Sequence, residues 1–213
     1  MSKHQNIIDA AVKANQARGF HAQYPEHPKA YGEAAPVQGE ADFNAALHQP
    51  FKALLQTGET GWGGGETSPY TQEPLGITYP LFTADTLVQH AAAAARKWQQ
   101  TSVSDRANIL VDTLEAIAQQ FFAMAHATMH TAGQPFMMSF QASGPHANDR
   151  ALEAIAMGYQ ELTRYPSQLL WEKPMGKMSV KLDKQFKPIP KGIGLVIGCS
   201  TFPVWNTLPG VYA

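Results

Sequence analysis

The sequence predicts an α/β protein, and three observations lead to this class. Several segments carry apolar side chains at helical spacing, whereas Met178–Lys187 alternates apolar and polar residues as a strand does. Gly194–Gly198 is a short apolar run between glycines, which is typical of a strand buried on both faces of a parallel sheet. Phe202 and Pro203 then predict a turn that leads into a helix over Trp205–Tyr212.

The amino-terminal part of the chain predicts two helices and a connector. Ile7–Ala17 is a short helical candidate that the following Arg-Gly pair would end. The polar, proline-rich connector HAQYPEHPKAYGEAAPVQGE is expected to be extended and to lie on the surface. Asp42 is a candidate N-cap of a second helix, which would carry an apolar stripe as far as Leu55 and stop at Gly58.

The stretch Gly58–Pro80 is rich in glycine and predicts a long loop. Its glycines at positions 61, 63, 64 and 65 are of the kind that cradle a phosphate. No Lys-Ser/Thr pair follows at the spacing of a P-loop, however, and no apolar strand precedes the glycines. We therefore expect a flexible loop around Trp62 and no phosphate site.

Three further helices are predicted in the middle of the chain. Thr83–Gln100 is rich in alanine and ends in basic residues, which suit the carboxyl end of a helix. Ser104 is a candidate N-cap of a long helix that reaches about Ala132, where a glycine and a proline would end it. The third helix is expected over Ala147–Arg164. We interpret the apolar stripes of these helices as ordinary core faces.

The strand candidates in the carboxyl-terminal part suggest that the chain is a fragment. Met178–Lys187 is expected to be a half-exposed antiparallel strand at a sheet edge or in an arm. Ile193–Gly198 needs a parallel neighbour on at least one side, and a crossover of a dozen or more residues must bring that neighbour back. None of the preceding segments supplies such a strand. The sheet that this segment should join is therefore expected to lie elsewhere.

Composition and charge indicate which partners to expect. The formal net charge is −1, which gives no electrostatic reason to expect nucleic acid as a partner. No apolar run approaches the ~20 residues that cross a bilayer, and the start of the chain lacks the apolar core of a signal peptide. The single cysteine, Cys199, cannot form an internal disulfide, so we expect a reducing cytoplasm.

The order of the parts resembles the aldehyde dehydrogenase superfamily. KPIPKGIGLVIGCSTFPVWNTLPGVYA resembles the family segment in which a P-x-G turn leads to a buried strand, an N-F-P motif and a helix. AAAAARKWQQTSVSDRANILVDTLEAIAQQ resembles the helical segment that precedes it, and HTAGQP stands where the family has E-x-G-K-P. The resemblance implies an amino-terminal extension over residues 1–81. It also implies that residues 82–213 are the incomplete amino-terminal part of a Rossmann-like coenzyme-binding domain, with its first strand and an oligomerisation-arm strand.

The glycine-rich stretch together with GCSTFPVWN is most similar to the phenylacetic acid degradation (PaaN) branch. That resemblance implies NAD or NADP as cofactor. The implied substrate is the semialdehyde formed when the activated aromatic ring is opened, and this aldehyde would be a small molecule that is either free or CoA-linked. It also implies a cytoplasmic homo-oligomer once the protein is complete.

The resemblance also implies roles for particular residues. In the family a thiolate attacks the aldehyde, a hydride passes to the nicotinamide, and a carboxylate activates water. Thr201 stands at the position of the Asn that holds the oxyanion, so Thr201, Asn206 or other donors must replace that amide. Ile197, Gly198, Cys199 and Ser200 match backbone that lines the dinucleotide cleft. The catalytic Cys and Glu are expected downstream, so we expect the chain alone to be inactive.

Three other interpretations start from single features. Cys199 is a candidate nucleophile at a strand-to-helix turn, although we favour a buried, inert thiol. His126 and His130 have the spacing of metal ligands, but no third ligand is evident, so we expect helix residues that are partly exposed and no metal. Finally, the chain is a candidate helical interaction module without activity, which would dock on a full-length partner.

Overall fold

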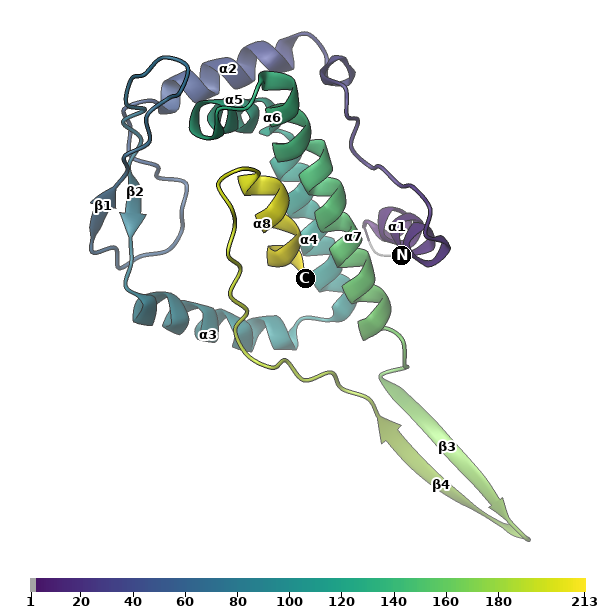
Figure 1. The fold of residues 1–213 in the computed structure, drawn as a ribbon. Helices are drawn as coiled ribbons and strands as arrows, with labels where there is room; N and C mark the ends of the chain where they lie inside the picture. The colour runs from purple at the N-terminus through teal and green to yellow at the C-terminus, as the bar shows by residue number, and fades with distance from the viewer. Residues whose placement is uncertain (1–2) are drawn as a thin grey trace.

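The computed structural model describes residues 3–213, which form a body of packed helices and one long hairpin (Figure 1). Its helices are α1 Gln5–Ala17, α2 Ala34–Ala46, α3 Ala84–Gln100, α4 Val103–Ala118, α5 Phe121–Ala132, α6 Phe136–Ser143, α7 Pro145–Leu162 and α8 Pro203–Tyr212, with the short 3-10 helix η1 Pro28–Tyr31. Its strands are β1 Gly61–Gly63, β2 Tyr79–Leu81, β3 Gln168–Met175 and β4 Met178–Gln185.

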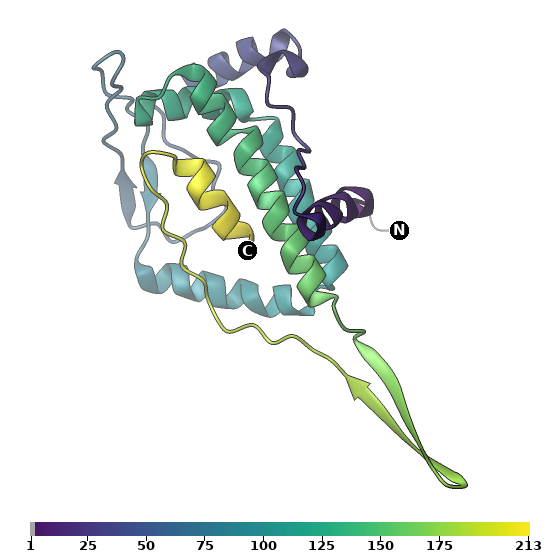
Figure 2. The same ribbon diagram turned by 45° about the vertical axis from the view of Figure 1, so that its right-hand side comes forward.

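The core lies where α1 and α4 to α7 meet. Its completely buried side chains include Ile8 of α1, Leu114 of α4, Phe121 of α5 and Phe140 of α6, and Leu152 of α7 is almost completely buried. Both ribbon views show α7 as the long central helix (Figure 2), and α4 and α8 both pack against it. No helix among residues 3–213 is long and apolar enough to span a bilayer.

Four helix predictions are confirmed, among them the one over Trp205–Tyr212, where α8 lies, and two are wrong. The helices α1, α3 and α7 lie where periodicity predicts them, and Thr83 caps α3 by accepting a hydrogen bond from the Thr86 N–H. The single helix expected from Ser104 to Ala132 is instead two helices, and Ser102 is the N-cap of the first. The chain leaves the first helix at Gln119 and Gln120, and the second helix begins with the buried side chains of Phe121 and Phe122.

The helix expected from Asp42 to Leu55 is also misplaced. The helix α2 begins at Ala34, inside the connector that was expected to be extended, and it ends at Ala46. Beyond that point the His48 N–H donates to the Leu75 carbonyl and the Phe51 N–H donates to the Thr78 carbonyl. Pro50 also disfavours helix here, because it has no N–H and restricts the residue before it.

The glycine-rich stretch is partly a small antiparallel sheet, so the prediction of one long loop is wrong for β1 and β2. Gly61, Trp62 and Gly63 pair with Leu81, Pro80 and Tyr79. At the next residue, Gly64, a Cβ atom would lie 2.0 Å from the Ile77 carbonyl oxygen. The close approach of the two backbones therefore requires a glycine at this position.

The antiparallel arm predicted from Met178 onward is confirmed, and the structure adds its partner strand. All of β3 pairs with all of β4 through a tight turn at Gly176, whose φ is +62°. The hairpin projects away from the helices (Figure 2), and nearly every residue of it is exposed. Both faces of β4 are therefore exposed rather than one. The stripe of α3 is likewise not a core face here, because α3 has no buried residue.

The segment Ile193–Gly198, expected as a buried strand, is neither a strand nor buried. Leu195 is 85% exposed and Ile197 is 83% exposed. None of the strands among residues 3–213 lies beside this segment, so its backbone has no ladder to join. It runs along α8 instead, where a Cβ on Gly210 would lie 3.1 Å from Val196 Cγ1.

Candidate functional site

The turn before α8 brings three polar side chains together. Cys199 Sγ lies 3.2 Å from Thr201 Oγ1, and the side-chain amide of Asn206 donates to the same sulfur at 3.1 Å. Pro203 occupies the first turn of α8, where its fixed φ suits the start of a helix and its missing N–H costs nothing. Asn206 lies one turn further along, and it therefore points back over the helix start toward Cys199.

The thiol of Cys199 has unusual acidity for an exposed side chain. The hydrogen bond from Thr201, followed by that from the Phe202 backbone, lowers its pKa from 9.0 to about 7. The thiol is exposed, so the expectation of a buried cysteine is wrong. A thiol with this pKa is partly ionised at neutral pH, and the thiolate is the reactive form.

The residues expected to contact cofactor form one exposed stretch with this turn. Ile197, Cys199 and Ser200 are all exposed. At Gly198 a Cβ would lie 2.1 Å from Thr207 Oγ1 of α8, so the chain passes close to the helix there. The small side chains at positions 198 to 200 leave the main chain accessible, which suits a ligand that approaches backbone.

A hydrogen bond that the sequence did not predict connects the turn before α8 to the loop between α5 and α6. The side-chain amide of Gln134, in the loop between α5 and α6, donates to the main-chain carbonyl of Thr201. The two residues are 67 positions apart, and both lie in segments whose motifs resemble a known family. The family resemblance is the one feature that Gln134 and Thr201 share in the sequence, and it does not predict that the two residues are in contact.

The rings of His126 and His130 face Phe43 of the helix α2. Both rings stack on Phe43, with centroids 6.0 and 5.0 Å from its ring. His130 Nδ1 lies 2.7 Å from the hydroxyl of buried Ser68. Burial lowers the pKa of His126, and the neighbouring His130 adds to this effect. Both histidines are partly exposed helix residues, as expected, and both pack on Phe43.

One cluster of potential metal ligands went unnoticed because His4 lies more than one hundred positions from Asp112 and Glu115. His4 Nε2 lies 2.7 Å from Asp112 Oδ1, and its Nδ1 lies 3.6 Å from Glu115 Oε1. Lys3 also donates to Asp112, so a cation of the chain already pairs with this carboxylate. The cluster anchors the start of α1 on α4.

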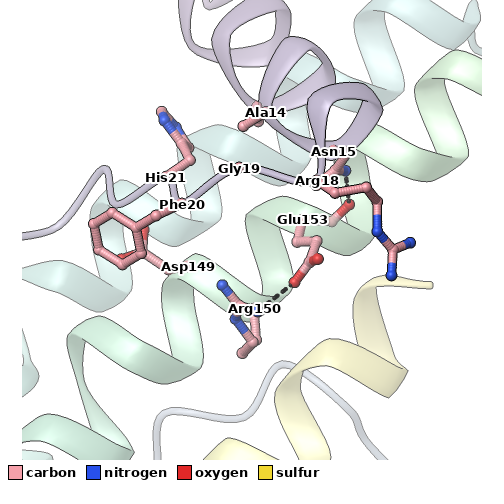
Figure 3. Close-up of a pocket in the computed structure, with 10 residues that line it drawn as sticks. Ala14, Asn15, Arg18, Gly19, Phe20, His21, Asp149, Arg150 and Glu153 are labelled. Carbon is pink, nitrogen blue, oxygen red and sulfur yellow. Dashed lines mark hydrogen bonds and ion pairs between the residues drawn. The ribbon is translucent and has the colours of Figure 1, made fainter.

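A polar cavity of about 230 Å³ lies between the end of α1 and α7 (Figure 3). Arg150 pairs with Glu153 at 2.7 Å in its wall, and Asn15 donates to the main-chain carbonyl of Glu153. Asp149 is nearly buried, and burial raises its pKa. None of the residues predicted as functional lines this cavity.

Comparisons with known proteins agree with the resemblance seen in the sequence. The model of the aldehyde dehydrogenase family matches residues 66–203. Among solved structures, the crystal structure of NAD-dependent aldehyde dehydrogenase from Burkholderia multivorans matches 100% of this chain at 40% sequence identity, with a TM-score of 0.93. The chain spans 39% of the length of that protein. No curated protein matches.

Proposed function

Because the chain belongs to the aldehyde dehydrogenase family, we propose that it is the amino-terminal part of an enzyme that oxidises an aldehyde to a carboxylic acid with NAD or NADP. The match over the whole chain at a TM-score of 0.93 carries this proposal. The exposed turn at Cys199, Thr201 and Asn206 supports it, because hydrogen-bond donors are gathered there at the end of an extended segment.

We assign the cofactor to the stretch Ile197–Ser200. Its exposed main chain and small side chains fit a dinucleotide that lies across the end of the segment, at the start of a helix. The nicotinamide, when bound, accepts the hydride. The residues of this stretch would orient the dinucleotide by backbone contacts. By the resemblance, the nucleophilic thiolate and the carboxylate base lie outside residues 1–213, and the chain alone is inactive.

Thr201 is our candidate for one oxyanion donor. The hydroxyl of Thr201 lies 3.2 Å from the sulfur of Cys199, whose pKa is lowered. The hydroxyl is therefore placed to donate a hydrogen bond to a negatively charged atom at this point. A hydroxyl has one proton to donate and is shorter than the family amide. Asn206 offers a second donor to the same point, at 3.1 Å from the sulfur.

The resemblance is the main support for the substrate, the compartment, the oligomer and the domain boundary. We propose the ring-opened semialdehyde of phenylacetate catabolism as substrate, free or CoA-linked, and a cytoplasmic homo-oligomer. We also keep a boundary near residue 81, between an amino-terminal extension and the coenzyme-binding part. The hairpin β3–β4 supports the oligomer, because its apolar side chains are exposed in this chain.

The alternative is a helical module without activity that docks on a full-length partner. The exposed apolar side chains of α3 and the hairpin, such as Leu87 and Leu182, favour a binding surface of some kind. The two functions differ in what the natural gene product contains. The intact mass of that product separates them, because a mass near 23.2 kDa leaves no room for the catalytic Cys and Glu.

The proposed activity is tested on the protein made from the complete gene. We expect reduction of NAD or NADP, followed at 340 nm, that depends on an added aldehyde, with the ring-opened semialdehyde preferred over aliphatic aldehydes of similar size. The isolated chain of residues 1–213 serves as the control and should give no signal. A folded full-length protein that reduces neither cofactor with any aldehyde tested would remove the proposal.

A further inference from the structure

Gln134 reaches across the fold to a single peptide unit of the candidate site. Its side-chain amide donates to the carbonyl of Thr201. The carbonyl of Thr201 and the N–H of Phe202 belong to the same planar peptide, in which they point in opposite directions. Whatever fixes that carbonyl therefore also fixes the direction of the Phe202 N–H.

The Phe202 N–H is one of the hydrogen-bond donors to the sulfur of Cys199. It lowers the pKa of the thiol together with the hydroxyl of Thr201 and the amide of Asn206. All the groups that lower this pKa are hydrogen-bond donors, and no charged side chain is among them. The acidity of the thiol thus depends on how this short turn is held.

Gln134 is itself held in place by neighbours. The hydroxyl of Tyr70 donates to its main-chain carbonyl at 2.9 Å, and the hydroxyl of Ser139 donates to the same oxygen at 3.3 Å. Within residues 3–213 its side-chain oxygen is buried and accepts no hydrogen bond. The side chain is therefore used as a donor, and its one partner is the Thr201 carbonyl.

We propose that Gln134 is a positioning residue for the turn Cys199–Phe202: its amide holds the Thr201–Phe202 peptide so that the N–H faces the site. A donor on the carbonyl also polarises the peptide and strengthens the N–H on its other side. The effect on Cys199 follows from the chain alone. The effect on turnover rests on the proposed function, in which the same turn carries the oxyanion donor Thr201.

The test measures alkylation of Cys199 by iodoacetamide against pH in the full-length protein, with the Cys199 peptide quantified by mass spectrometry. In the unaltered protein the rate should be half-maximal near pH 7. Gln134→Ala and Gln134→Glu remove the donor, so the midpoint should rise and the rate at pH 7 should fall roughly fivefold. Gln134→Lys restores a donor and should move the midpoint back.

Gln160→Glu is the matched control, because it makes the same change at an exposed position of α7. It should leave the midpoint unchanged, and far-UV circular dichroism confirms that each variant is folded. A midpoint that does not move in folded Gln134→Ala and Gln134→Glu overturns the inference. The proposed function is judged separately by aldehyde-dependent cofactor reduction. If the midpoint moves in a protein that shows no such activity, the positioning role of Gln134 is supported and the proposed dehydrogenase activity is excluded.

Discussion

The side-chain amide of Asn148, which is completely buried in α7, donates a hydrogen bond of 2.8 Å to the main-chain carbonyl of Leu114 in α4. Leu114 is itself completely buried. This bond fixes the relative position of two central helices, and α8 packs on α7 with the candidate site at its start. A buried polar group with such a partner gives direction to a core that consists mostly of apolar contacts.

We expect Asn148→Leu to lower the free energy of unfolding by about 1–3 kcal/mol. The leucine keeps the branched shape of the side chain but cannot donate a hydrogen bond to the Leu114 carbonyl. Urea unfolding followed by circular dichroism measures the change. Gln160→Leu, at an exposed site of the same helix, should stay within about 0.5 kcal/mol. Equal losses in the two variants would show that the buried hydrogen bond contributes nothing.

Two helical glycines should respond to alanine in opposite ways. At Gly39 of α2 a Cβ would lie 2.2 Å from Phe122 Cβ, so Gly39→Ala should force the helices α2 and α5 apart and cost about 1–3 kcal/mol. At Gly158 of α7 a Cβ would meet nothing within 4 Å. Gly158→Ala should therefore stabilise by about 0.5–1 kcal/mol, through helix propensity. Thermal unfolding of both variants checks the pair, and a stabilised Gly39→Ala would contradict this packing of the two helices.

Sequence periodicity predicted the helices whose bounds depend on local signals. The helices α1 and α3 begin and end close to their expected residues, since a capping threonine and an Arg-Gly pair act within a turn of the helix. Periodicity could not predict α2 or the break before Phe121, because both depend on distant partners. Tyr31, for example, packs edge-on against Phe121, Phe122 and Phe140.

The candidate site shows the same division between local and distant information. Cys199, Thr201 and Asn206 lie within eight positions of one another, so their meeting could be anticipated from a turn followed by a helix. The role of Gln134 could not be anticipated, because a hydrogen bond from a glutamine side chain to a distant main-chain carbonyl has no sequence motif. The exposure of Cys199 was also mispredicted, since burial depends on the strands beside Ile193–Gly198, and residues 3–213 contain none there.

One face of the hairpin β3–β4 is mostly apolar and the other mostly polar, which predicts how it assembles. Leu182 lies opposite Trp171 on the apolar face, whereas Lys181 pairs with Glu172 on the other face, at 3.6 Å. Leu182→Asp should shift the full-length protein toward monomers, because a buried, unpaired carboxylate is costly. Light scattering after size exclusion measures the mass. Ser179→Asp, on the polar face, should leave it unchanged.

A single oligomeric mass for the native protein, Leu182→Asp and Ser179→Asp would exclude the apolar face as the subunit contact. A native protein that is already monomeric would remove the proposed homo-oligomer.

Thr201 provides the most direct test of the proposed chemistry in this part of the chain. Thr201→Ala removes the hydroxyl that lies 3.2 Å from Cys199 Sγ, while the main chain that would contact the cofactor stays in place. If this hydroxyl holds the oxyanion, turnover of the full-length enzyme should fall by roughly 10²–10³, equivalent to about 2.7–4 kcal/mol in the barrier. Affinity for NAD, measured by fluorescence titration, should not change. Thr201→Ser keeps the donor and should recover most of the rate, whereas unchanged turnover in Thr201→Ala would remove Thr201 from the mechanism and leave Asn206 as the remaining candidate.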